Sequence, residues 1–168
     1  MTHWTQGLLN LAACADAVEW AKQYDSLAAA WAACDRGDWM LWLLGKQSGE
    51  VGSPARRRFV FIACQCARLA LPYTTDPQVL ASIETTERYT RGEATLEDVR
   101  TTAYAAYAAY AAYAAAADAY AAAAVYAAAD AAAYAAADAA AYVDTMKRCA
   151  DIIREHCPEP PEIEGRKR

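Results

Sequence analysis

The chain has 168 residues, a formal net charge of −5 and 57% hydrophobic residues, yet only two Phe. Alanine accounts for this combination, because 28 of the 45 alanines lie between Ala103 and Ala141. The length favours one domain that can bury a sizeable core without disulfides or metals. The acidic balance, without any basic stripe, argues against non-specific binding of nucleic acid.

The composition also argues against a membrane protein. The longest apolar runs, 103–117 and 119–129, are bounded by Asp118 and Asp130 and are shorter than a membrane-spanning helix. Residues 1–6 lack the basic and apolar segments of a signal peptide. We therefore expect a soluble, cytoplasmic protein that does not bind membranes.

Six cysteines are then expected to be reduced, and to be mostly small buried hydrophobes. None of their spacings is typical of a zinc site, since Cys64 and Cys66 would point to nearly opposite sides of a helix. The sequence predicts neither a metal nor a cofactor.

The first 52 residues predict three helices and a loop. Apolar residues recur at three- and four-residue intervals over 7–24, and Ser26 caps a second helix that ends before Gly37. Residues 38–44 lack a polar face, which favours a helix in the core over an exposed apolar contact surface. The loop Gly45–Gly52 is rich in glycine but lacks the spacing of a Walker phosphate-binding loop.

Ser53-Pro54 begins the next helix with a capping side chain and a proline at the first helical position. Arg56, Arg57 and Arg58 lie in its first turns, where the helix dipole disfavours positive charge. This placement indicates an acidic partner inside or outside the chain, and a solvated patch paired with local Glu is the alternative. The helix is expected to end at Leu71-Pro72 and to bury Phe59, Ile62, Ala63, Cys66, Leu69 and Ala70.

Asp76-Pro77 repeats the cap-and-proline signal before a helix that we expect to extend to about Thr90. After the turn at residues 91–93, Thr95 and Asp98 resemble a capping box. From that cap to Cys157 there is no Gly or Pro. One helix of this length would measure about 90 Å, so we expect it to fold back, with turns near Asp118 or Asp130.

Eight tyrosines and three aspartates are interspersed among the alanines of this stretch. Tyrosine would supply the buried area that alanine lacks, and Tyr134 and Tyr142 lie four residues from Asp138. We expect Tyr–Asp hydrogen bonds between helices. The alternative is an exposed Tyr/Asp surface that binds a partner.

The sequence thus predicts an all-α fold, a compact bundle of about six to eight helices with an Ala/Tyr-rich C-terminal half. We expect one helical domain over residues 1–157, with Trp/Leu/Cys-rich helices in 7–92 and Ala/Tyr/Asp-rich helices in 95–157. Residues 158–168 are expected to form a disordered tail. Its Ile163-Glu164-Gly165-Arg166 matches a protease site used in expression vectors and suggests a vector remnant.

Two segments, residues 14–21 and 30–45, resemble a family of immunity proteins, and Cys34-Asp35-Arg36-Gly37-Asp38-Trp39 is the most specific part. The similarity continues in Cys64–Arg68, in 91–97 and in the Ala/Tyr/Asp repeat. The resemblance implies a helical, cytoplasmic protein of bacterial or phage origin that binds and neutralises a toxin. It implies no catalytic residues.

Our leading hypothesis is a non-enzymatic protein that binds a toxin or a host factor. The carboxylate pairs Glu84/Glu87 and Asp35/Asp38 are expected to be solvated, and no catalytic residue is predicted. The alternatives are a binder of a small molecule or nucleotide, or an enzyme, with a pocket lined by Tyr, Asp and Arg, and a self-associating scaffold. The candidate partner-binding residues are Tyr104, Tyr107, Tyr110, Asp118, Asp130, Asp138, Arg56, Arg57 and Arg58.

Overall fold

The computed structural model describes residues 3–73, 77–107 and 139–163. All regular secondary structure in these ranges is helical, with eight α-helices and one 3-10 helix, which confirms the predicted all-α fold. None of these helices is long and apolar enough to cross a membrane. The expected turns near Asp118 and Asp130 lie outside the described residues.

The chain divides into two units by its internal contacts. Unit 1 comprises residues 1–48 and 146–168, and unit 2 comprises residues 49–145. The single domain predicted over residues 1–157 stays a prediction.

Unit 1 begins with two short helices where the sequence predicts one. These are α1 (Gln6–Asn10) and α2 (Ala15–Ala21), and between them Ala12 adopts a left-handed backbone with φ of 63°. The amides of Ala12 and Ala13 donate to the carbonyls of Leu9 and Leu8, at 2.9 and 3.0 Å. These bonds satisfy the last carbonyls of α1 and end the helix, so the single helix expected over 7–24 is wrong.

The next two helices follow the sequence signals. The Ser26 hydroxyl accepts a hydrogen bond from the Ala29 amide at 3.1 Å and begins α3 (Leu27–Ala33). The helix α4 (Gly37–Gln47) buries Met40, Leu41, Leu43 and Leu44, as expected for a core helix.

The C-terminal part of α9 (Ala139–His156) holds unit 1 together. Nη1 of Arg154 donates to the carbonyl of Cys34 at 2.6 Å and to that of Trp31 at 3.3 Å, at the end of α3. The Trp31 indole donates in return to the carbonyl of Cys157 at 3.0 Å. The cationic side chain of Arg154 thus donates to carbonyls at the C-terminal end of α3, where the helix dipole favours positive charge.

At Gly37, α4 closely approaches α9. A Cβ at this position would lie 2.7 Å from the carbonyl oxygen of Met146 and 3.0 Å from the nitrogen of Ala150. Both are backbone atoms of α9, so a larger residue could be accommodated only by a shift of the helices. After α9, Ile163 lies against Gly7 of α1, with its Cδ1 2.8 Å from the position of a Cβ there.

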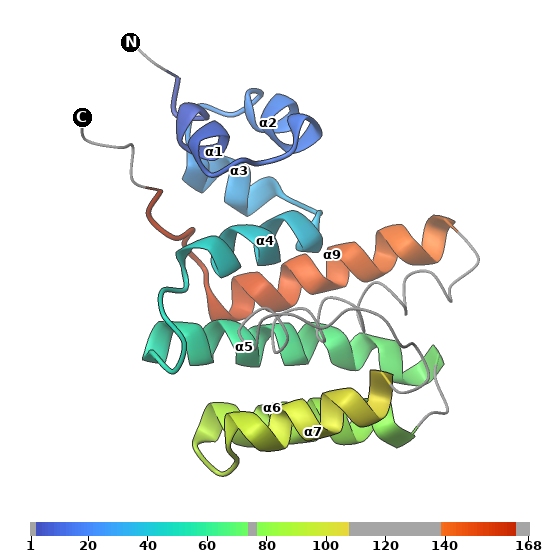
Figure 1. Cartoon of the computed structure of the whole chain (residues 1–168). Coiled ribbons are helices and arrows are strands. Elements are labelled where there is room, and N and C mark those ends of the chain that lie inside the picture. Colours follow the sequence, from blue (N-terminus) through green and yellow to red (C-terminus); the bar gives the residue numbers. More distant parts are fainter. Residues whose placement is uncertain (1–2, 74–76, 108–138, 164–168) are drawn as a thin grey trace. The chain divides into compact units, whose positions relative to one another are not determined.

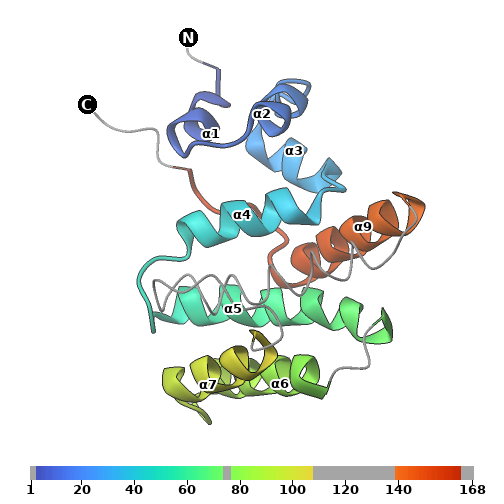
Figure 2. The same cartoon turned by 45° about the vertical axis from the view of Figure 1, so that its right-hand side comes forward.

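Unit 2 contains α5 (Pro54–Ala67), the 3-10 helix η1 (Arg68–Tyr73), α6 (Pro77–Arg91) and α7 (Leu96–Tyr107). The colours in Figures 1 and 2 show that α6 runs antiparallel to α5 and that α7 lies beside α6. Of the stripe expected on α5, Phe59, Ile62, Ala63 and Cys66 are buried, whereas Leu69 is half-buried. The helix expected to reach Leu71 ends at Ala67, where η1 begins.

The connection between α6 and α7 also agrees with the sequence. Gly92 takes a left-handed φ of 80°, which favours glycine, and Thr95 and Asp98 form the predicted capping box. The Thr95 amide donates to Asp98 Oδ2 at 2.7 Å, and the Asp98 amide donates to Thr95 Oγ1 at 3.1 Å. Val99 of α7 then packs with Tyr89 of α6 in a buried cluster.

A partly buried ion pair joins α6 to the start of η1, and its Arg68 side chain is 37% exposed. Nε and Nη2 of Arg68 donate to the two carboxylate oxygens of Glu87 at 2.6 and 2.7 Å, and Gln65 of α5 donates to the same carboxylate at 3.0 Å. The Glu87 side chain is 10% exposed. The hydrogen bonds from Arg68 lower the pKa of Glu87 below its usual value.

We predict that Glu87→Gln lowers the free energy of unfolding at pH 7 by about 2 kcal/mol, because Arg68 loses its charged partner. The lowered pKa of Glu87 means that the carboxylate stabilises the fold fully above its unfolded value of about 4.5, and that this contribution is lost as pH falls through the folded value. The difference between wild type and variant should therefore shrink at pH 3. Denaturant unfolding at both pH values measures it.

The matched control for this prediction is Glu84→Gln on the same helix, where the carboxylate is exposed. A change within about 0.5 kcal/mol is expected there. A Glu87→Gln variant as stable as wild type at pH 7 would contradict the role assigned to the pair.

We predict that Gly37→Ala destabilises the chain by about 2–3 kcal/mol, because its new methyl group meets backbone atoms of α9. Thermal or denaturant unfolding checks this value. Gly52→Ala is the control, since nothing lies within 4 Å of its Cβ position and only its φ of 77° opposes the change, at a cost of about 1 kcal/mol. Equal losses in the two variants would argue against close packing at Gly37.

Candidate functional site

An open cleft of about 680 Å³ lies in unit 2, between the first turns of α5 and the last turn of α6. Three of the seven lining residues are arginines, and none is acidic. The lining residues are Gly52, Pro54, Arg57, Arg58, Phe61, Thr90 and Arg91. We call this site the arginine cleft.

One face of α5 supplies the larger part of the arginine cleft. Pro54, Arg57, Arg58 and Phe61 follow one another at intervals of three, one and three residues, which places them along one stripe of an α-helix. The Ser53 hydroxyl begins this helix by accepting a hydrogen bond from the Arg56 amide at 3.1 Å. One stripe of α5 packs into the core. The neighbouring stripe, which carries these four residues, lines the cleft.

The end of α6 supplies the opposite side. Because α6 runs antiparallel to α5, its last residues Thr90 and Arg91 meet the beginning of α5. Gly92 follows directly, and a Cβ there would lie 3.7 Å from Nη1 of Arg57. The α5–α6 pairing thus brings residues more than 30 positions apart into one site.

Arg57 has the most unusual surroundings of the three arginines. Its guanidinium carbon lies 5.6 Å from the centre of the buried Tyr89 ring, a cation–π contact. Its Nε is buried, and among the described residues it has no hydrogen-bond acceptor. A buried donor without an acceptor costs about 1–3 kcal/mol, and this nitrogen is covered from solvent.

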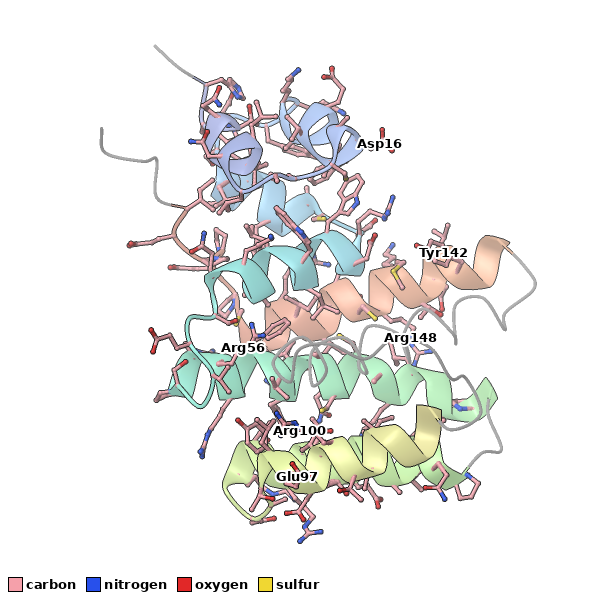
Figure 3. The ribbon with its side chains drawn as sticks, in the orientation of Figure 1. Asp16, Arg56, Glu97, Arg100, Tyr142 and Arg148 are labelled. Carbon is pink, nitrogen blue, oxygen red and sulfur yellow. The ribbon has the colours of Figure 1, made fainter. Side chains whose placement is uncertain are left out.

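The other arginines at this end of α5 and α6 differ in their roles. Arg91 is paired with Glu93 at 3.0 Å, but both side chains are about half exposed, so the pair is weak and easily exchanged. Arg56, labelled in Figure 3, does not line the cleft and lies over the Phe59 ring at 5.4 Å. Arg57 and Arg58 therefore supply the positive charge of the α5 face.

The structure describes the positions of only part of the predicted partner-binding set. Arg57 and Arg58 lie together in the cleft, and Arg56 lies beside it. Tyr104 and Tyr107 belong to α7, but their side chains lie outside the description. The remaining four, Tyr110, Asp118, Asp130 and Asp138, also lie outside the described residues.

Five lining residues, Gly52, Pro54, Phe61, Thr90 and Arg91, are absent from the sequence-based set. The α5 residues among them carried a usable signal, because Pro54 and Phe61 continue the helical spacing of Arg57 and Arg58. The contribution of α6 had no such signal, since it depends on how α6 pairs with α5.

Two other carboxylates that could have taken part in a reaction form ion pairs within the chain. Glu87 is bound to Arg68, and Asp38 is bound to Arg36 with its two oxygens 2.8 and 2.6 Å from the guanidinium nitrogens. Within the described ranges no three His, Cys, Asp or Glu side chains lie close enough together to hold a metal ion. One member of each predicted carboxylate pair thus forms an ion pair within the chain.

The cysteines are mostly packing residues, as predicted. Cys34, Cys64, Cys66 and Cys149 are buried, whereas Cys14 is exposed and Cys157 is half-buried. Burial raises the pKa of the Cys64 thiol to about 12, so this thiol stays protonated at neutral pH and is a poor nucleophile.

Comparisons of the chain with protein-family models, with curated proteins and with solved structures find no match. The resemblance to immunity proteins therefore stays a prediction. Its most specific segment has a structural role, because Arg36 binds Asp38 and covers the Trp39 ring at 4.3 Å while Gly37 packs against α9. This segment belongs to unit 1, where its Cys34 and Gly37 are buried, and it does not line the arginine cleft.

Proposed function

We propose that this protein is a non-enzymatic, immunity-like binding protein that neutralises a toxin or a host factor by holding an acidic part of it in the arginine cleft. The observation that carries the proposal is the lining of this cleft, where three arginines occur without an acidic residue. The chain as a whole is acidic, so the basic cleft is a local feature that would direct an acidic partner to one place.

The residue types in the cleft are those of a protein interface. Arginine and aromatic residues are enriched among the residues that dominate binding energy at such interfaces. Arg57 is held in place by Tyr89, so less side-chain entropy would be lost when a partner binds. The proposal therefore gives Arg57 the leading role.

The openness of the cleft favours a protein partner over the small-molecule alternative. Sites for small molecules usually bury most of the ligand surface and are lined mainly by apolar side chains. The arginine cleft is open, and Phe61 is its one aromatic lining residue. An acidic segment that extends beyond the cleft on a partner surface would fit this shape better than an enclosed metabolite.

We predict that the tagged wild-type chain, purified gently from its native host, retains a protein partner, and that Arg57→Glu and Arg58→Glu each reduce its recovery at least tenfold. Reversal of one charge in a close interfacial pair typically costs several kcal/mol, which is more than this factor requires. Quantitative mass spectrometry measures the recovery. Addition of the purified chain should then inhibit the activity of the recovered partner.

The matched control is Arg148→Glu, which makes the same charge change at an exposed position of α9 that does not line the cleft. Unfolding curves for all variants separate lost binding from lost folding. Absence of any partner with wild type would contradict the proposed function. Equal recovery by Arg57→Glu and Arg148→Glu would show that the partner binds elsewhere.

A further inference from the structure

We propose that residues 158–163 form a strap that holds α1 in place, and that release of this strap opens α1. Both segments belong to unit 1. Figures 1 and 2 show the C-terminal segment, in red, leaving α9 and running toward α1. The strap is thus a conformational device that connects the end of α9 to the first helix of the chain. It is independent of the arginine cleft, which lies in unit 2.

The helix α1 has few local sources of stability. It has five residues, whereas isolated helices shorter than about 12 residues are marginal in water. Gly7 lies inside it, and glycine is the least favourable residue for a helix interior apart from proline. The Thr5 hydroxyl hydrogen-bonds to Nδ1 of His3 at 2.9 Å and does not cap the helix. Contacts with other parts of unit 1 must therefore hold α1.

Gly7 and Ile163 fit against each other. A Cβ on Gly7 would lie 2.8 Å from Cδ1 of Ile163 and 3.2 Å from its Cγ1, which is closer than carbon atoms pack. Gly7 is buried and Ile163 is half-buried. The missing side chain at residue 7 thus makes room for Ile163. The glycine that weakens α1 as an isolated helix is the residue that lets the strap contact it.

The strap is anchored at its beginning by a hydrogen bond and at its end by packing. The Trp31 indole donates to the carbonyl of Cys157, directly before the strap, at 3.0 Å. Three of the six strap residues are prolines, which have no N–H to donate. Residues 160, 161 and 163 are half-buried, and residues 158, 159 and 162 are exposed. Loss of the contact at Ile163 should therefore free the strap while α9 stays in place.

The test is amide hydrogen exchange, followed by NMR on the full chain. The amides of Leu9 and Leu11 donate to the carbonyls of Thr5 and Gly7 at 3.2 Å, so they exchange when α1 opens. We expect Ile163→Ala to speed the exchange of both amides at least about fivefold, because the packing of a half-buried side chain on α1 is lost. The amides of α5, in unit 2, should exchange as in wild type.

Gly7→Ala, made in two backgrounds, separates the strap from the helix propensity of α1. In the Ile163→Ala background the new methyl group has space, and the better helix former should slow the exchange of Leu11 by about fivefold. In the wild-type background the same methyl group displaces Ile163, so this gain should be lost or reversed. An equal effect of Gly7→Ala in both backgrounds would contradict the contact between the strap and α1.

The matched control is Glu162→Ala, which changes the exposed neighbour of Ile163 and should leave the exchange of α1 unchanged. Unchanged exchange in Ile163→Ala would overturn the proposal. The indole of Trp4, which donates to the carbonyl of Tyr24 at 2.7 Å, and the buried Leu8 would then hold α1 without the strap.

Faster exchange of α4 to the same extent as α1 would also overturn the proposal, because Ile163 would then stabilise unit 1 as a whole. These failures are distinct from failure of the proposed function. Partner recovery that depends on Arg58 would stand whatever the exchange of α1 shows, since the strap and the arginine cleft belong to different units.

Discussion

The ion pair between Arg68 and Glu87 is the interaction on which unit 2 depends most. It joins α6 to the end of α5, with both arginine nitrogens on the two oxygens of one carboxylate. Such a pair favours one register of the two segments, because the nearly buried Glu87 carboxylate would be left without its charged partner in any other register. That register places the end of α6 against the beginning of α5, so Thr90 and Arg91 complete the arginine cleft.

Local features of the fold could be predicted from the sequence. Ser26, Ser53 and the Thr95/Asp98 box cap helices where they were expected, because a cap depends on residues within one turn. The break after α1 could not be predicted, since an alanine there takes a left-handed φ that its residue type disfavours. The close approach at Gly37 also needs the position of α9, more than 100 residues away.

The candidate site likewise contains residues that could be predicted from the sequence and residues that could not. The three adjacent arginines against the helix dipole marked the beginning of α5, and two of them do line a cleft. Phe61 could have been added from helical spacing alone. Arg91 and Thr90 required the pairing of α5 with α6, and the buried state of Nε in Arg57 required the position of Tyr89. Residue type therefore indicated the charge of the site, while tertiary packing determined its shape.

The proposed function depends on the arginine cleft as the place where an acidic part of a partner binds. The most direct measurement is the recovery of a protein partner from the native host by the tagged wild-type chain and by its Arg58→Glu and Arg148→Glu variants. We predict that wild type and Arg148→Glu recover the partner, and that Arg58→Glu recovers at least tenfold less of it. Equal recovery by Arg58→Glu and Arg148→Glu would contradict a role for the cleft.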